Sequence, residues 1–235
     1  TAVGTMSSAA TLAVALDCAR KSKVLRKDMV SFGIPLFANI HLCGSVLTEV
    51  FFCMTISKIL YPEDNHYEGK KLHLTQHYFF TSASLQYAIK DFKRRFGTRF
   101  NLLPEKIAIQ INDTHPTMVI PELIRILTTE EGFTMDEAID VVSHTCAYTN
   151  HTILAEALEK WPLAYIEEVV PQLVPIIKEL SDRVAKKYKD EKVQIIDKDK
   201  RVHMAHIDIH YGYSVNGVAA IHTEILKESE LNHFY

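Results

Sequence analysis

The segment Lys106–Leu127, KIAIQINDTHPTMVIPELIRIL, decides the fold class. Its apolar residues alternate over Ile107–Ile111, which is the period of a β-strand. The alternation stops at NDTHP, and a proline just inside a helix start loses no hydrogen bond. We therefore predict a strand over Ile107–Ile111 and a helix over Pro116–Thr129, with Asp113 or Thr114 as the helix cap.

A second segment, His144–Pro162, repeats this plan as HTCAYTNHTILAEALEKWP. We predict a strand over Cys146–Thr149, again followed by polar residues. In open α/β sheets, ligands bind beyond the carboxyl ends of the strands. We therefore expect Asp113, His115 and His151 to approach one crevice.

The rest of the chain alternates in the same way between helical and strand patterns. A helix is predicted over Leu72–Phe96, and Thr134 and Glu137 form a capping box at the start of another. Further strands are predicted at Val193–Ile196 and Val202–Ile209. Strands that alternate with helices indicate an α/β fold with a mostly parallel, helix-covered sheet.

Several aromatic and sulfur-containing side chains are assigned to the core. The aromatic residues Tyr78, Phe79, Phe80 and Trp161 would suit sugar stacking, but their apolar neighbours favour core packing. Cys146 lies in an apolar strand and is expected to pack as a small hydrophobe.

The composition limits the classes of partner. With 235 residues, a net charge of −3 and a pI near 6.4, the chain lacks the basic excess of a nucleic-acid surface. Its four cysteines have no paired metal spacing, so reduced thiols and a cytoplasmic location are expected. The uncharged stretch Val30–Thr48 follows basic residues, as a membrane span can, but its glycines, proline, asparagine and histidine argue against one.

The motifs together resemble those of the α-glucan (glycogen, starch or maltodextrin) phosphorylase family. NDTHP, IPELIRIL and CAYTNHT…EALEKWP resemble the family in the segments quoted above. Ile56–Gln86 and Arg201–Lys227 resemble its flanking segments, so residues 54–235 are interpreted as part of the family's N-terminal domain. Residues 1–53 show no clear motif and are interpreted as an unmatched or divergent segment, or the product of a disturbed reading frame.

The resemblance implies a fold and an activity. Intact phosphorylases join two doubly wound (Rossmann-like) domains in a GT-B-type glycosyltransferase, form homodimers, and transfer glucose from an α-1,4-glucan or maltooligosaccharide to inorganic phosphate. The product is glucose 1-phosphate. The cofactor pyridoxal 5'-phosphate is held by a lysine of the second domain, which is not among these 235 residues. We therefore expect a fragment, beginning at Thr1 without a signal peptide, that is inactive alone; the alternative is a non-catalytic glucan-binding or assembly module.

The resemblance also implies roles for seven residues. Catalytic roles in lining the glucosyl pocket fall on Asp113, His115 and His151. Substrate-binding roles fall on Asp64 and Asn65 in a loop that gates the crevice, and on Thr152 and Glu159. His73 departs from the family pattern, because the family often carries an arginine there, near the phosphate route.

A metal site is the rival interpretation of the segment His206–His210. If Val202–Ile209 were a strand, then His206, Asp208 and His210 would share one face, as metal ligands can. The same alternation describes a half-buried strand with a wet face. The sequence therefore predicts no metal.

Overall fold

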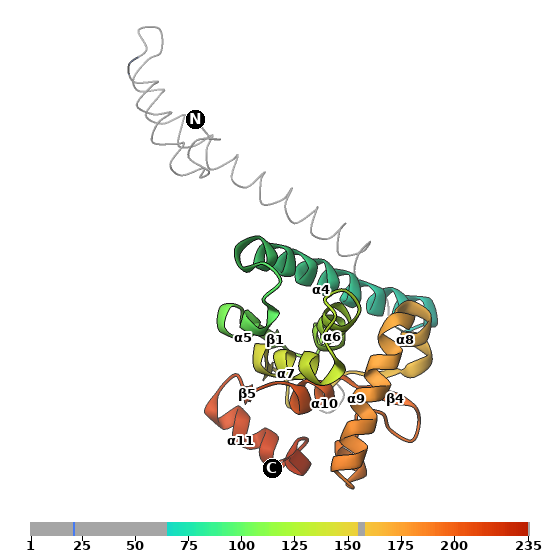
Figure 1. Ribbon diagram of the computed structural model, residues 1–235. Helices are drawn as coiled ribbons and strands as arrows, with labels where there is room; N and C mark the ends of the chain where they lie inside the picture. Colours follow the sequence, from blue (N-terminus) through green and yellow to red (C-terminus); the bar gives the residue numbers. More distant parts are fainter. Residues whose placement is uncertain (1–20, 22–64, 155–157, 235) are drawn as a thin grey trace. The chain divides into compact units, whose positions relative to one another are not determined.

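The computed structural model describes residues 21, 65–154 and 158–234. All the elements discussed here belong to one compact unit, Glu63–Tyr235 (Figure 1). In chain order they are α4 (Tyr67–Phe96), α5 (Leu103–Lys106), β1 (Ile109–Asn112), α6 (Val119–Thr129), α7 (Met135–Thr145), β2 (Cys146–Asn150), β3 (Lys160–Pro162), α8 (Leu163–Val169), α9 (Val174–Lys187), β4 (Arg201–His203), α10 (Met204–Tyr211), β5 (Val215–Gly217) and α11 (Ala220–Glu228).

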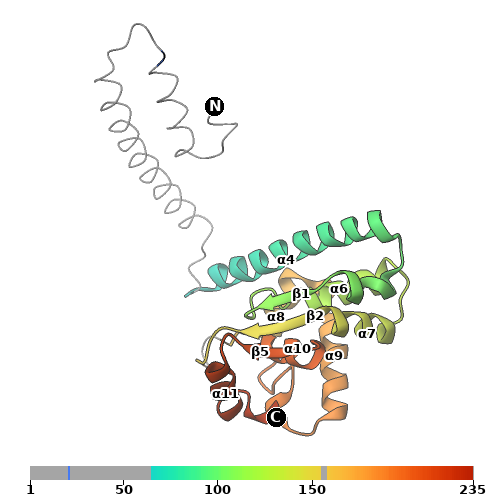
Figure 2. The same ribbon diagram turned by 90° about the vertical axis from the view of Figure 1, so that its left-hand side faces the viewer.

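The main sheet confirms the predicted parallel arrangement. Strand β2 pairs in parallel with β1 on one side and with β5 on the other, giving the order β1-β2-β5. Helices pack around these strands, and in Figure 2 the strands follow below α4 in that order. Strands β3 and β4 form a separate antiparallel pair. The fold is therefore α/β, as expected, and the sequence had not predicted β5 as a strand.

Helix α4 starts earlier than its apolar pattern predicts. His66 caps it, because the His66 side chain accepts a hydrogen bond from the backbone N–H of Gly69. The helix buries Leu74, Leu85 and Phe92 among others, at spacings that repeat on one helical face. The early start converts part of an expected surface loop into the first helical turn.

Local capping signals were predictive in one place and wrong in another. The capping box at α7 is confirmed, with reciprocal hydrogen bonds between Thr134 and Glu137. Helix α6 instead begins at Val119, and its cap residue Met118 makes no side-chain capping bond. Asp113 and Thr114 therefore do not cap α6, because a turn separates them from the helix.

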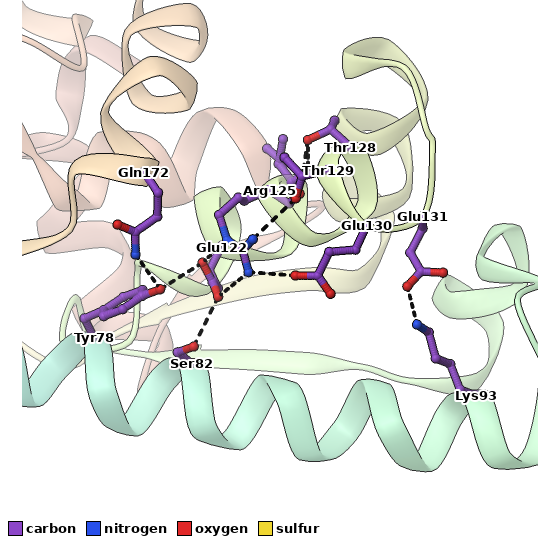
Figure 3. A network of polar contacts seen from close by, with 11 residues as sticks. Tyr78, Ser82, Lys93, Glu122, Arg125, Thr128, Thr129, Glu130, Glu131 and Gln172 are labelled. Atoms are coloured by element: carbon purple, nitrogen blue, oxygen red, sulfur yellow. Dashed lines mark hydrogen bonds and ion pairs between the residues drawn. The ribbon is translucent and has the colours of Figure 1, made fainter.

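A buried acid joins α6 to α4. Glu122 is only 1% exposed and accepts two hydrogen bonds from Arg125, at 2.9 and 3.1 Å. The hydroxyl groups of Tyr78 and Ser82 donate to the same carboxylate from α4, at 3.3 and 3.1 Å (Figure 3). Each carboxylate oxygen thus has partners from both helices, which compensates for its burial.

The strand predicted at Val202–Ile209 is wrong beyond its first residues. Only Arg201–His203 is a strand, and α10 follows at once. The buried side chains Met204, Ile207, Asp208 and Tyr211 recur at three- and four-residue spacing, which is a helical period. The segment is too short for periodicity alone to separate the two structures. The strand predicted at Val193–Ile196 is also wrong: Glu191–Val193 forms a 3-10 turn, and Ile196 makes only an isolated bridge.

Core packing followed the prediction fully for two of the five side chains, in part for Tyr78, which is half-buried against the core, and not for the other two. Trp161 is 7% exposed and Cys146 is fully buried, and burial raises the pKa of the Cys146 thiol to about 12. Phe79 and Phe80, by contrast, are 63% and 62% exposed. Both point away from the face of α4 that carries the buried leucines.

An apolar groove of about 420 Å³ runs between α4 and β1. Its lining includes Phe80, Leu85, Ile109 and Val119. Among the described strands, β1 has a neighbour only on the β2 side. No helix of the described part is both long and apolar enough to cross a bilayer, and Val30–Thr48 lies outside that part.

Candidate functional site

Two loops leave the same end of the sheet. Asn112 pairs with Thr149 in the parallel register, so the residues after β1 and β2 emerge side by side. The backbone N–H of Asp113 donates to the carbonyl oxygen of Thr149 at 2.8 Å, which ties the first loop to strand β2. His151 follows β2 directly. The strand ends thus present both predicted loops at one edge.

Asp113 has an unusual backbone conformation at this edge. Its φ is 60°, in the left-handed region that aspartate tolerates better than most residues. Its Oδ1 accepts a hydrogen bond from the N–H of Thr114 at 3.1 Å. The turn therefore holds the Asp113 carboxylate by local bonding instead of using it as a helix cap.

His115 and Glu159 form the clearest contact between predicted site residues. The Nδ1 of His115 lies 3.0 Å from the Oε1 of Glu159. This hydrogen bond raises the pKa of His115, with burial opposing it. Burial alone would raise the pKa of Glu159, but the His115 bond and the nearby His77 charge lower it overall. Both shifts favour an imidazolium–carboxylate pair.

We predict that Glu159→Gln moves the His115 titration back toward an ordinary histidine pKa. The raised His115 pKa means that the pair stabilises the fold fully below pH 6.5 and loses that effect as pH rises through the raised value. The lowered Glu159 pKa means that the effect is present above pH 4.5 and is lost as pH falls through the lowered value. NMR titration of the His115 ring measures the change.

Glu167→Gln is the matched control, because Glu167 pairs with Lys178 on another surface. It should leave the His115 titration in place. An unmoved His115 pKa in Glu159→Gln would contradict the assigned cause.

More histidines surround Glu159 than the sequence motifs indicate. His77 Nδ1 lies 3.8 Å from Glu159 Oε2, and the His77 ring centroid lies 5.3 Å from that of His115. His73 and His77 make an edge contact at 4.3 Å, and both rings also lie edge-on to Trp161. His77 was missed. The available signal was its four-residue spacing from His73 on a predicted helix.

His151 and Thr152 lie apart from the hydrogen bond between His115 and Glu159. His151 is exposed, and no hydrogen bond between described residues links it to His115 or Glu159. Thr152 serves its own turn: its N–H donates to Asn150 Oδ1 at 2.9 Å, and its hydroxyl accepts from the N–H of Leu154.

The gating loop is described only at its end. Asn65 is exposed just before α4, and Asp64 lies outside the described residues. A pocket of about 440 Å³ opens beside Glu159 near this end of α4. Its lining includes Lys70, His73, Glu159, Lys160, Trp161 and Arg201.

The rival metal set of His206, Asp208 and His210 is not brought together on α10. His206 and His210 lie four apart on one helical face and bond the backbone carbonyls of Gln194 and Val193, at 2.6 and 2.7 Å. Asp208 is buried on the other face, where the hydroxyl of Thr117 donates to it at 2.5 Å. On a strand these three side chains would share one face, but on helix α10 Asp208 lies on a different face from His206 and His210. Burial also raises the pKa of Asp208 well above its usual value.

Comparison with known proteins places the chain in a family. A family model described as carbohydrate phosphorylase matches residues 27–235. The chain belongs to the carbohydrate phosphorylase family. It is 58% identical over 180 residues to the maltodextrin phosphorylase of Streptococcus pneumoniae, and 45% identical over 198 residues to the human muscle form of glycogen phosphorylase. Each alignment covers 77% of this chain and 24% of the relative, so the chain spans about a quarter of these phosphorylases.

Proposed function

We propose that this chain supplies the glucosyl-binding wall of an α-1,4-glucan phosphorylase. The intact enzyme would transfer a terminal glucosyl unit to inorganic phosphate and release glucose 1-phosphate. Membership of the carbohydrate phosphorylase family supports this proposal, as does the similarity to named maltodextrin and glycogen phosphorylases. The observation that carries it is the pairing of His115 with Glu159 beside the loop that holds Asp113.

The proposed wall would recognise a hexose by its hydroxyl groups. With Nδ1 held by Glu159, the His115 ring has its Nε2 available for a sugar hydroxyl. His151 and Asp113 would add a second imidazole and a carboxylate from the adjoining loop tips. A sugar with misplaced hydroxyls would leave such groups unpaired, which is how polar sites discriminate.

Four further residues complete the proposal. Glu159 orients His115, and Thr152 supports the turn that carries His151. Asp64 and Asn65 would belong to a loop that gates the crevice. We place residues 54–235 in the N-terminal domain of a two-domain GT-B-type enzyme, as part of a cytoplasmic homodimer.

The described residues do not fit the attachment of pyridoxal 5'-phosphate. This cofactor is held by a lysine Schiff base, which is favoured where the lysine is desolvated. Every lysine in the described ranges is at least partly exposed. No lysine of the described ranges suits this role, and from the family resemblance we propose that the attachment lysine lies outside these 235 residues and that this polypeptide alone does not turn over substrate.

Turnover is expected to be absent. The 235-residue chain, incubated with maltooligosaccharide, phosphate and pyridoxal 5'-phosphate, should release no glucose 1-phosphate above background. A full-length phosphorylase assayed in parallel is the positive control. Release by the chain alone would contradict the inactivity and would leave the binding role to be tested separately.

Weak oligosaccharide binding is expected to persist. NMR titration of the chain with maltooligosaccharide, in the presence of EDTA, should show saturable shifts. His115→Ala and His151→Ala should each weaken binding about tenfold, which is the loss of one or two hydrogen bonds. His144→Ala is the matched control, because His144 is an exposed histidine on α7 that bonds Asp140. Equal binding by all three variants would contradict the assignment of His115 and His151 to the glucosyl-binding wall.

A further inference from the structure

Three metal-ligating side chains converge beside the 440 Å³ pocket. His73 and His77 are four apart on α4, so they occupy one face of the helix. Glu159 approaches the same face from the residue before β3. One ligand atom from each of the three side chains lies within 4.8 Å of the other two. Two side chains of α4 and one from the residue before β3 thus converge on one point.

Only one of the two oxygens of the Glu159 carboxylate has a hydrogen-bond partner among the described residues. Its Oε1 contacts His115 at 3.0 Å. Its Oε2 is buried and has no hydrogen-bond partner among the described residues, and the nearest ring nitrogen, His77 Nδ1, lies 3.8 Å away. A buried carboxylate oxygen without a partner is costly. A cation between Oε2 and the imidazoles would remove that cost.

We propose that His73, His77 and Glu159 bind a divalent transition metal, with zinc as the best match. Two imidazoles and one carboxylate form a donor set that zinc accepts with tetrahedral geometry. Bonds of about 2.0–2.2 Å place tetrahedral ligand atoms about 3.3 Å apart. Since the three ligand atoms lie within 4.8 Å of one another, no separation has to close by more than about 1.5 Å.

The surroundings suit a three-ligand site. Each imidazole uses one nitrogen for the metal and keeps the other for its present contacts. His115 would remain on Glu159 Oε1 and hold the carboxylate in orientation, as outer partners of metal ligands do. The fourth position would face the pocket, where Lys70 and Lys160 favour an anionic ligand such as chloride or hydroxide.

This site goes beyond the proposed glucan role and shares Glu159 with it. It also departs from the sequence prediction of no metal, which considered a different set of histidines. A metal at Glu159 would bring a positive charge beside His115, so metal and sugar binding are expected to influence each other. The two proposals remain separable, because the sugar titration is run in EDTA and the metal titration without sugar.

The test is a zinc titration of the full 235-residue chain after EDTA treatment and desalting. Isothermal calorimetry should show one equivalent of zinc, and cobalt should give the visible absorption of a tetrahedral complex. His73→Asn, His77→Asn and Glu159→Gln should each weaken zinc binding at least about a hundredfold, since each removes a direct ligand and outer-partner losses alone cost 10–100-fold. His144→Asn is the matched control and should bind zinc as the parent does.

Thermal unfolding with and without zinc is a second test, which can also be applied to variants that are less stable. Zinc should raise the thermal midpoint of the parent chain and of His144→Asn, because ligand binding to the folded state stabilises it. It should leave the midpoints of the three ligand variants unchanged. Binding that survives all three substitutions, or no binding by the parent chain, would overturn the proposal.

Discussion

Replacing Arg125 with methionine is expected to destabilise the folded chain by about 3–5 kcal/mol, the usual cost of leaving a buried charge without its partner. Glu122 is 1% exposed, and the Arg125 guanidinium supplies two of its hydrogen bonds. Methionine keeps the length of the side chain and removes the charge. Tyr78 and Ser82 would then remain as neutral donors to an uncompensated carboxylate (Figure 3).

Urea unfolding at neutral pH, followed by fluorescence of the single buried tryptophan, Trp161, measures this loss. The double variant Glu122→Gln/Arg125→Met should recover part of it, because the amide carries no charge and still accepts from Ser82. Arg183→Met is the matched control: Arg183 pairs with Asp136 and Glu179, which are both exposed acids, so a loss below about 1 kcal/mol is expected. A comparably small loss in Arg125→Met would show that the Glu122 pair behaves as a surface pair.

Gly212→Ala is expected to cost about 1–3 kcal/mol by overpacking a backbone contact. A methyl group on Gly212 would lie 2.7 Å from the carbonyl oxygen of Asp208 and 3.3 Å from that of Cys146. Both obstacles are backbone atoms, one in α10 and one in β2, so no side chain can rotate away. Only a glycine allows the end of α10 to pass so close to the central strand.

Thermal and urea unfolding measure the Gly212→Ala change. Gly132→Asn is the matched control, because a side chain there meets nothing within 4 Å and asparagine tolerates the left-handed φ of 76°. If Gly212→Ala is as stable as the control, the α10–β2 contact is looser than the structure describes.

The sequence predicted those features that neighbouring residues decide. The capping box of Thr134 and Glu137 needs only three residues of separation, and it formed as expected. Both strands follow from short apolar runs and appear within one or two residues of their predicted bounds, but the next described element after β2 is strand β3 and not the predicted helix. The parallel pairing then places Asp113 and His151 at one edge without any further information.

Features that depend on distant packing were not predicted. The sequence pattern predicts a strand where α10 forms, because eight residues show too few periods to separate a helix from a strand. The approach of His77 to Glu159 joins segments far apart in the chain: the four-residue spacing of His73 and His77 places both on one helical face, but it does not indicate that Glu159 lies there. Phe79 and Phe80 look like core residues by type, but their phase on α4 turns them outward.

Among the described strands, β1 is paired on one side only, and this has a practical consequence. A strand with an open row of backbone donors and acceptors is a template for strands of other molecules. Beside β1 lies the apolar groove lined by Phe80, Leu85 and Ile109, and exposed apolar surface of this kind favours association. Concentrated solutions of the chain will therefore tend to self-associate along this margin, and dilute, cold handling favours the monomer.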